Sequence, residues 1–285
     1  MKIGIVSRTD KEEAIELDRN IVKYLLANHV EIELDTSLAK ELEEYSDLET
    51  PIEDMTSDIV LCVGGDGTVL NAQHVLSPKK IPILSINMGT VGFLTEIEVE
   101  NTFEALDAIL DGEWSKEKRT QLIISHENQT FRALNEVVIM TARPAKMLHY
   151  EISVDGEVVE ELRADGLIIS TPSGSTAYSM SAGGPIVDPK VGAFIIVPIC
   201  PYKLGVRPFV VSDASEIRIK LIKRGKKAIF VMDGQVQKEV NYIEELVIKK
   251  SEKDVYFMRI NKKYFYKKVK DKLNEGGLDS INRVL

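Results

Sequence analysis

The stretch LCVGGDGTVL, residues 61–70, carries an apolar run directly into three glycines that surround one carboxylate. The run Ile59–Val63 predicts a buried strand, and a helix is expected from about Thr68. Glycines let backbone N–H groups approach a ligand closely, and the N-terminus of a helix attracts anions. The stretch therefore predicts a strand, a turn and a helix, with an anion site at the end of the strand.

The turn matches neither of two common phosphate-binding patterns. No Gly-Lys-Ser/Thr follows, as a P-loop requires, and Leu70 stands where a dinucleotide fingerprint has its third glycine. A tight turn without a ligand is the alternative, but it does not require three glycines in four residues, which cost conformational entropy. Asp66 would repel phosphates, so we expect it either to bind Mg²⁺ on a nucleotide or to accept a proton from an attacking hydroxyl.

Strands and helices alternate on both sides of this turn. Residues 2–6, 31–34 and 81–86 have strand composition, and apolar residues at helical spacing follow Asp10-Lys11-Glu12-Glu13, which has the pattern of a capping box. Alternation of this kind predicts a Rossmann-like α/β domain with a parallel sheet, which we place at residues 1–113.

The pattern changes near Trp114. Asp155-Gly156 and Asp233-Gly234, each between apolar runs, predict β-hairpins with tight turns. Residues 114–260 are therefore expected to form an antiparallel, β-sandwich-like domain. Residues 261–285 are expected to form a helical tail that packs back on the first domain.

The composition excludes several classes of protein. The chain has 285 residues and a net charge of −9, which argues against broad binding to nucleic acid. No apolar stretch approaches the ~20 residues of a membrane span. Two cysteines in apolar runs and the lack of a signal-peptide pattern suggest a cytoplasmic protein. The four histidines have no metal-ligand spacing, so no metal-binding residue is predicted.

Two further stretches carry unusual polar groups. Asn135-Glu136 lies in a β-like run, where it marks either an exposed strand edge or hydrogen-bonding groups for a base and a ribose. Residues 163–185, RADGLIISTPSGSTAYSMSAGGP, contain many small and hydroxyl side chains. Their composition suits a linker, but a buried strand precedes them, and Tyr178 suits contact with a flat ring better than it suits a linker.

Together these three stretches resemble the NAD kinase family. GGDGT alone is shared with diacylglycerol-type lipid kinases and, more distantly, phosphofructokinases, whereas the Asn-Glu pair and the long second motif are specific to NAD kinases. The resemblance implies phosphorylation of the 2′-hydroxyl of the adenosine ribose of NAD by ATP or polyphosphate with Mg²⁺. It also implies a homodimer or homotetramer. A lipid kinase and a non-catalytic NAD-binding regulator are the alternatives.

The resemblance also assigns roles to individual residues. Asp66 is the expected catalytic residue, which accepts the hydroxyl proton. Asp165 is expected to hold the nicotinamide end, and Lys146 and Arg163 are the cations expected near phosphate. Asn71 departs from the family, because many relatives carry a basic residue there. The residues expected to bind substrates are Gly64, Gly65, Gly67, Thr68, Phe93, Asn135, Glu136, Lys146, Arg163, Asp165, Thr176, Ala177, Tyr178, Ser181 and Gln235.

Overall fold

The computed structural model describes residues 1–89, 92–143, 146–223, 226–240, 244–260 and 265–270. The chain divides into two compact units. The first consists of Met1–Lys118 and Val255–Leu285, and the second of Arg119–Asp254. Each unit is built around a core of its own.

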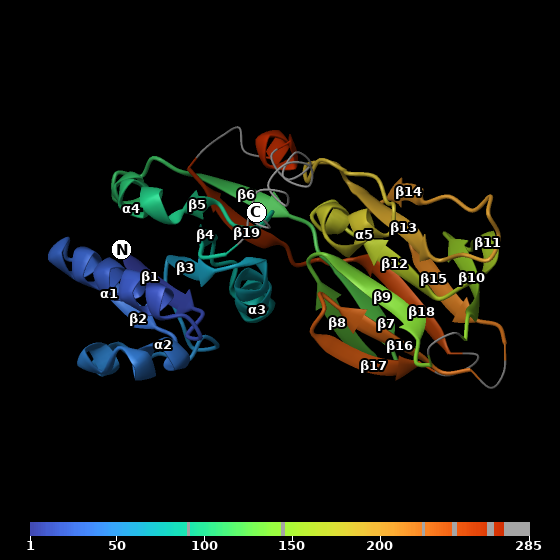
Figure 1. The fold of residues 1–285 in the computed structure, drawn as a ribbon, viewed down its shortest axis with the longest axis horizontal. Coiled ribbons are helices and arrows are strands. Elements are labelled where there is room, and N and C mark those ends of the chain that lie inside the picture. Colours follow the sequence, from blue (N-terminus) through green and yellow to red (C-terminus); the bar gives the residue numbers. More distant parts are fainter. Residues whose placement is uncertain (90–91, 144–145, 224–225, 241–243, 261–264, 271–285) are drawn as a thin grey trace, which may run out of the picture. The chain divides into compact units, whose positions relative to one another are not determined.

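The described part of the first unit contains a seven-stranded sheet with strand order β2-β1-β3-β4-β19-β6, in which β5 also pairs with β4. Strands β1 to β4 are parallel, as predicted, and β19 joins β4 in the same direction. Helix α3 leaves directly from β3 (Figure 1). The strands are β1 (Lys2–Ser7), β2 (Glu31–Leu34), β3 (Ile59–Gly64), β4 (Ile83–Asn87), β5 (Ile97–Glu98), β6 (Ser115–Arg119) and β19 (Val255–Arg259).

The helices of this unit bury one apolar face against the sheet. Ile21 and Leu25 of α1 share a core with Ile5 of β1 and Leu61 of β3, all of them inaccessible to solvent. The helices are α1 (Glu12–Ala27), α2 (Thr36–Glu41), α3 (Asp66–Leu76) and α4 (Thr102–Leu110), with 3₁₀ turns η1 (Glu43–Leu48), η2 (Ser77–Lys79) and η3 (Val99–Asn101).

The start of α1 differs from the prediction. Lys11 is the N-cap, and no side chain caps the helix. Asp10 instead binds the Arg8 guanidinium through two hydrogen bonds of 2.8 and 2.7 Å. The predicted capping box is therefore wrong, because a nearby guanidinium offers the carboxylate two charge-assisted bonds.

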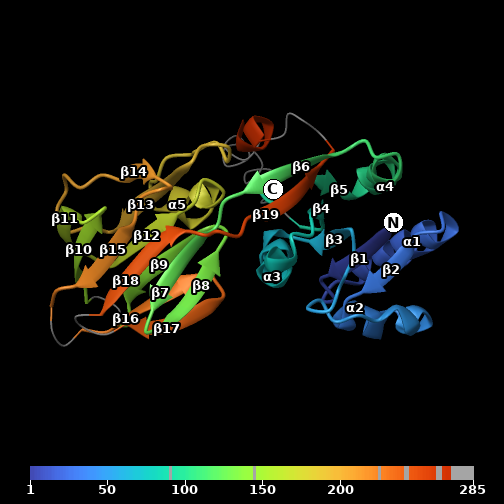
Figure 2. The same ribbon diagram turned by 180° about the vertical axis from the view of Figure 1, so that it is seen from behind.

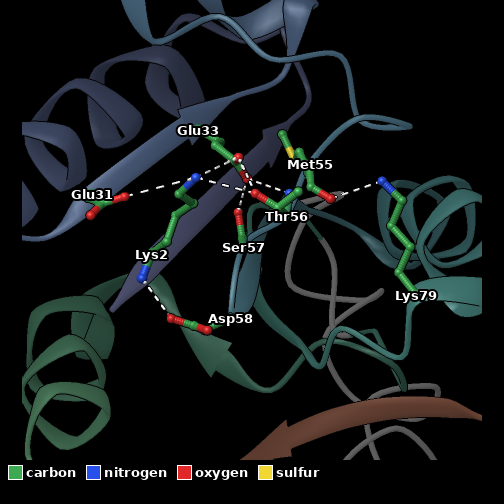
Figure 3. Close-up of polar contacts among 8 residues, drawn as sticks. All are labelled: Lys2, Glu31, Glu33, Met55, Thr56, Ser57, Asp58 and Lys79. Carbon is green, nitrogen blue, oxygen red and sulfur yellow. Dashed lines mark hydrogen bonds and ion pairs between the residues drawn. The ribbon is translucent and has the colours of Figure 1, made fainter.

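A polar network lies near the amino ends of β1 and β3, at the opposite end of β3 from the glycine turn. Figure 3 shows Lys2, Thr56 and Ser57 converging on Glu33, which is 7% exposed. Glu33 accepts hydrogen bonds from Lys2 Nζ at 3.2 Å and from the Thr56 backbone N–H at 2.9 Å. A buried carboxylate held in this way ties the segment before β3 to β2.

The described residues of the second unit form two antiparallel six-stranded sheets, with orders β11-β10-β15-β18-β7-β8 and β14-β13-β12-β9-β16-β17. Alternate residues of both sheets share one core, which includes Tyr150, Phe194 and Phe230. Strands β9 and β12 lie side by side, as the reverse view in Figure 2 shows.

The elements of the second unit are β7 (Leu122–His126), β8 (Gln129–Ala133), β9 (Glu136–Thr141), β10 (Leu148–Val154), β11 (Glu157–Ala164), β12 (Gly166–Ser170), η4 (Gly174–Thr176), α5 (Tyr178–Ser181), β13 (Ala193–Ile199), β14 (Phe209–Ser212), β15 (Ile217–Leu221), β16 (Ala228–Met232), β17 (Val236–Val240) and β18 (Glu245–Lys250). Asp155 and Asp233 each take positive φ at their hairpin turns, as the Asp-Gly pattern predicts.

The unit limits differ from the domain limits expected at residues 114 and 260, because β6 and β19 both belong to the sheet of the first unit. Residues 265–270 of the expected tail are helical, and Lys268 there is 7% exposed. Residues 261–264 and 271–285 of that tail lie outside the described residues. No helix in the described residues is long and apolar enough to cross a membrane.

Candidate functional site

The glycine turn joins β3 to α3 and leaves open space. Gly64 ends β3, and Gly65 is the N-cap of α3 with extended backbone angles and no side-chain cap. A Cβ on Gly64 would lie 2.2 Å from Thr68 Oγ1, whereas a Cβ on Gly65 or Gly67 would meet no atom within 4 Å. Neither Gly65 nor Gly67 has a positive φ. Packing therefore requires Gly64, but neither packing nor backbone strain explains the other two, which suits close approach of a ligand.

Asp66 faces a second turn, at residues 92–95. Its Oδ2 accepts the Phe93 backbone N–H at 2.9 Å, and its Oδ1 accepts those of Leu94 and Thr95 at 3.0 and 3.3 Å. A Cβ on Gly92 would lie 2.2 Å from Asp66 Oδ1, so only glycine permits this contact. Asp66 thus holds the turn after β4 against the start of α3, and Phe93 contributes its backbone amide.

A buried group of charges lies beside these turns. Arg259 Nη1 contacts Glu96 Oε2 at 2.7 Å, and Glu96 is 2% exposed. Burial, and next the charge of Arg259, lower the pKa of Lys268 to about 8, while Glu96 and Asp66 act in the opposite direction. Lys268 therefore lies within electrostatic range of Asp66, which the sequence did not suggest.

In the second unit, the Asn135-Glu136 pair is held from two sides. The Asp233 carboxylate accepts the backbone N–H groups of Leu134, Asn135 and Glu136 at 2.8, 2.8 and 3.1 Å. On the other side, the Thr171 backbone N–H donates to Asn135 O at 2.8 Å. The backbone of the pair is therefore fixed without the use of its own side chains.

The side chains of the pair are buried and incompletely satisfied. Asn135 and Glu136 are 7% and 6% exposed, and among the described residues Asn135 Oδ1 and Glu136 Oε2 have no hydrogen-bond partner. Burial, and next the charge of Asp233, raise the pKa of Glu136 to about 8. Unpaired polar atoms in a buried position cost stability, so the pair suits a ligand that supplies the missing hydrogen bonds.

The segment after β12 packs directly on this pair. A Cβ on Gly174 would lie 2.2 Å from Asn135 O, so the 3₁₀ turn η4 approaches the pair as closely as a backbone can. Thr176, in η4, is buried, and its hydroxyl donates to Ser173 O at 3.2 Å. Ala177 and Tyr178 follow, and Tyr178 is 43% exposed, which leaves its ring accessible to a ligand. The segment thus packs against the Asn135-Glu136 pair as η4 and α5 and is not a linker.

Other predicted residues lie apart from the pair or show no contact with it. Arg163 is exposed on β11, and its guanidinium lies 4.3 Å from the ring centroid of Tyr202. Lys146, Ser181 and Gln235 are exposed. Asp165 is half-buried between β11 and β12, where its backbone pairs with Thr141 and Ile199. Within the described part of the chain, no hydrogen bond or ion pair joins these side chains to Asn135 or Glu136.

One polar cluster was not expected from the histidine spacing. His126, Glu127 and Glu244 each offer a ligand atom within 4.8 Å of the others, a separation that could hold a metal ion. His126 Nε2 lies 3.1 Å from Glu244 Oε2, so a direct hydrogen bond between the two side chains accounts for that contact equally well. His126 ends β7 and Glu127 follows it in the turn to β8, whereas Glu244 directly precedes β18.

Comparison with known proteins identifies the family. Residues 3–114 match the model of the ATP-NAD kinase N-terminal domain, and residues 134–260 match that of the ATP-NAD kinase C-terminal domain. The chain belongs to the NAD kinase family. As a member of that family it is a kinase, and the resemblance stated from its motifs is confirmed.

Individual relatives cover almost the whole chain of this NAD kinase family member. It is 57% identical to the NAD kinase of Methanothermobacter thermautotrophicus over 99% of both chains, and 60% identical to that of Methanosphaera stadtmanae over 97% of this chain and 100% of the relative. The crystal structure of an Archaeoglobus fulgidus NAD kinase in complex with ATP is similar, with a TM-score of 0.78, 33% identity and coverage of 95% and 99% of the two chains.

Sequence reasoning missed two residues that contact the candidate site residues, Asp233 and Gly92. Asp233 was seen only as a turn residue, although its carboxylate fixes the Asn-Glu backbone. Gly92 was noted only through its neighbour Phe93, and its close approach to the Asp66 carboxylate was not expected. The Asp-Gly hairpin was a usable signal for Asp233, because an Asp at such a turn often binds nearby backbone N–H groups.

Proposed function

We propose that this chain phosphorylates NAD at the 2′-hydroxyl of its adenosine ribose, with ATP or polyphosphate as donor, to give NADP. The observation that carries the proposal is the buried Asn135-Glu136 pair with one unpaired oxygen on each side chain. An Asn amide can accept from the adenine amino group and donate to a ring nitrogen, and a Glu can exchange hydrogen bonds with ribose hydroxyls. A dinucleotide therefore supplies the groups that this pair lacks.

The glycine turn is the proposed seat of the donor phosphates. The space beside Gly65 and Gly67 admits phosphate oxygens to the backbone N–H groups at the start of α3, where the helix dipole favours negative charge. Gly64 and Thr68 complete the turn. The Archaeoglobus relative was solved with ATP, which supports ATP as one donor. Polyphosphate presents the same oxygens and stays a second candidate.

Asp66 is the proposed acceptor of the hydroxyl proton. Its Oδ2 accepts one backbone N–H, so a lone pair on this oxygen is left for a substrate O–H. As the new oxygen–phosphorus bond forms, the bond from phosphorus to the leaving phosphate breaks, and the ribose proton passes to the carboxylate. The amides of residues 93–95 fix the direction of the carboxylate.

We infer that Mg²⁺ enters bound to the donor. Mg²⁺ keeps several waters and commonly reaches a protein through substrate phosphates and one or two carboxylates. Asp66 is the carboxylate of the glycine turn, and both of its oxygens already accept backbone hydrogen bonds. These residues do not form a ready-made metal cage, so the ion would neutralise phosphate charge as part of the donor.

The remaining expectations are proposals of the same kind. We propose that Phe93, Lys146, Arg163, Asp165, Ser181 and Gln235 contact the substrates. We also propose a cytoplasmic homodimer or homotetramer that has neither a membrane nor a nucleic acid as partner. Exposed apolar side chains such as Tyr202 and Leu204, which are 66% and 91% exposed, support contact with another copy of the chain.

A donor screen tests the function. Purified protein is incubated with NAD, Mg²⁺ and either ATP, other triphosphates or polyphosphate, and NADP is measured with an NADP-specific dehydrogenase. Phosphorus NMR of the product then locates the phosphate on the 2′-oxygen. Absence of NADP with every donor, or phosphorylation of a diacylglycerol in its place, would contradict the proposal.

A further inference from the structure

The strand order of the first unit predicts where a ligand binds at its sheet. Strand β1 lies between β2 and β3, and the chain leaves β1 through α1 towards β2 but leaves β3 through α3 towards β4. Right-handed crossovers place two such helices on opposite faces of the sheet. Ligands of open parallel sheets bind at this reversal, beyond the carboxyl ends of the two strands. The glycine turn supplies one side of the crevice, and the β1–α1 connection supplies the other.

The β1–α1 connection is fixed against the residue that precedes the glycine turn. Ser7 pairs with Val63 across the sheet. The Ser7 hydroxyl donates to Val63 O at 3.2 Å, and the Arg8 backbone N–H donates to the same oxygen at 3.0 Å. The two connections therefore begin side by side, and their geometry relative to one another is set by backbone hydrogen bonds.

Lys11 brings a cation from this connection to the ends of β3 and β4. Its Nζ donates to Met88 O at 3.3 Å, and the Met88 backbone N–H donates to Gly64 O at 3.0 Å. The ammonium thus contacts Met88, and the backbone N–H of Met88 is in turn bonded to Gly64, the first glycine of the turn. Arg8, by contrast, is bound to Asp10 by two charge-assisted bonds. The Lys11 ammonium donates to a neutral carbonyl, although its charge also lowers the pKa of Asp10, after the larger effect of the hydrogen bond from Arg8.

The glycines that follow β3 and β4 leave room for a further group. Cβ atoms added to Gly65, Gly67 and Gly89 would meet nothing within 4 Å, and Gly89 follows Met88 directly. These glycines come from both strand ends that Lys11 connects. The acidic side chains in the first turn of α1, Glu12 and Glu13, are exposed, so solvent screens their charge.

We propose that Lys11 binds the phosphate chain of the donor and supplies a positive charge at the glycine turn, where Asn71 of α3 is uncharged. The inference rests on the proposed function for the identity of the donor. Lys11 releases Met88 O and turns its ammonium to a phosphate oxygen, while the N–H groups of the glycine turn bind from the opposite side. NAD recognition by Asn135 and Glu136 is independent of this contact.

The test compares Lys11→Met, Lys11→Arg and Lys23→Met, the last an exposed lysine of the same helix. ATP affinity is measured without NAD by calorimetry, and KM values for ATP and for NAD are measured in the kinase assay. Loss of a charge-assisted bond predicts ATP binding about tenfold or more weaker for Lys11→Met. The KM for NAD should change less than about twofold, Lys11→Arg should retain most of the ATP affinity, and Lys23→Met should match the wild type.

The outcomes separate this inference from the proposed function. ATP binding that is equally strong in Lys11→Met and in Lys23→Met overturns the role of Lys11, whatever the kinase assay shows. An equal loss of affinity in Lys11→Met and Lys23→Met also overturns it, because the effect would then be one of general surface charge. If the wild-type protein binds ATP through Lys11 but forms no NADP, the role of Lys11 stands and only NAD as the proposed acceptor is contradicted.

Discussion

The Asp233 carboxylate accepts the backbone N–H of Asn135 at 2.8 Å, although 98 positions separate the two residues in the sequence. Its two oxygens also bind the amides of Leu134 and Glu136, so a single hairpin residue fixes three consecutive peptide units. The side chains of the pair are thereby left unused and oriented. This is the arrangement expected of residues that bind a ligand and not of residues that build the fold.

Asp233→Asn should weaken NAD binding, because an amide NH₂ would face a backbone N–H that now meets a carboxylate oxygen. We expect a loss of about 1–3 kcal/mol in stability and about a tenfold or greater rise in the KM for NAD. Asp155→Asn is the matched control, since Asp155 has the same turn conformation and binds the Glu216 N–H at 2.9 Å in the other sheet. Equal effects of the two substitutions on KM would show that Asp233 acts on stability alone.

Gly67→Ala separates a structural role of the glycine turn from a binding role. The added methyl meets no protein atom within 4 Å and lies in helix α3, so stability should be unchanged or higher by up to about 1 kcal/mol. The same methyl occupies the space proposed for phosphate oxygens, so the KM for the donor should rise about tenfold or more. Thermal unfolding and donor kinetics measure the two effects. Normal donor kinetics would place the phosphates elsewhere.

Asp66→Asn should lower turnover by about 10²-fold or more while NAD binding persists. The substitution also disturbs the hydrogen bonds to residues 93–95, so calorimetric NAD binding and the unfolding midpoint must accompany the kinetics. Gly92→Ala displaces the same carboxylate without removing it and should lower turnover as well. Wild-type turnover in Asp66→Asn would remove the carboxylate from proton transfer.

The sequence predicted the local elements well, because the signals for them are local. Apolar runs marked β1, β3 and β4, and the Asp-Gly pairs marked two hairpins whose Asp residues adopt positive φ. The place of β6 and β19 was missed. Residues 115–119, SKEKR, are too charged to be recognised as a strand, and residue 255 returns to the first sheet only after the whole second unit.

The candidate site residues also divide into those that have a local signal in the sequence and those that do not. The Asn135-Glu136 pair and the glycines could be proposed as site residues from the sequence alone, since unusual residues in a strand or turn are visible there. Asp233 and Gly92 contact the candidate residues from other turns, and only the folded chain shows that they are near. Lys11 was interpreted as part of a capping box, whereas its contact is with Met88, which follows β4, two strands away from β1 in the sheet.

The raised pKa of Glu136 predicts a pH dependence of the ligand-free protein. Its pKa is about 8 in the folded chain, against an ordinary value of 4.5. Between these two pH values the unfolded chain has lost the Glu136 proton while the folded chain keeps it. The contribution of Glu136 to the free energy of unfolding is therefore complete below about pH 4.5 and is lost as the pH rises to about 8. Glu136→Gln removes the titrating group, and its denaturation midpoint should fall less steeply between pH 5 and 8 than that of the wild type.

Asp18 is the matched comparison for this measurement, because burial also raises its pKa to about 8 but it lies in α1 of the first unit. Trp114, which packs on the core of the first unit, reports the unfolding of that unit by fluorescence, and far-UV circular dichroism reports both units. Asp18→Asn should flatten the pH dependence seen by fluorescence, and Glu136→Gln should flatten the part seen by dichroism alone. An unchanged slope in Glu136→Gln would mean that Glu136 is ionised in the folded protein and meets NAD as a carboxylate.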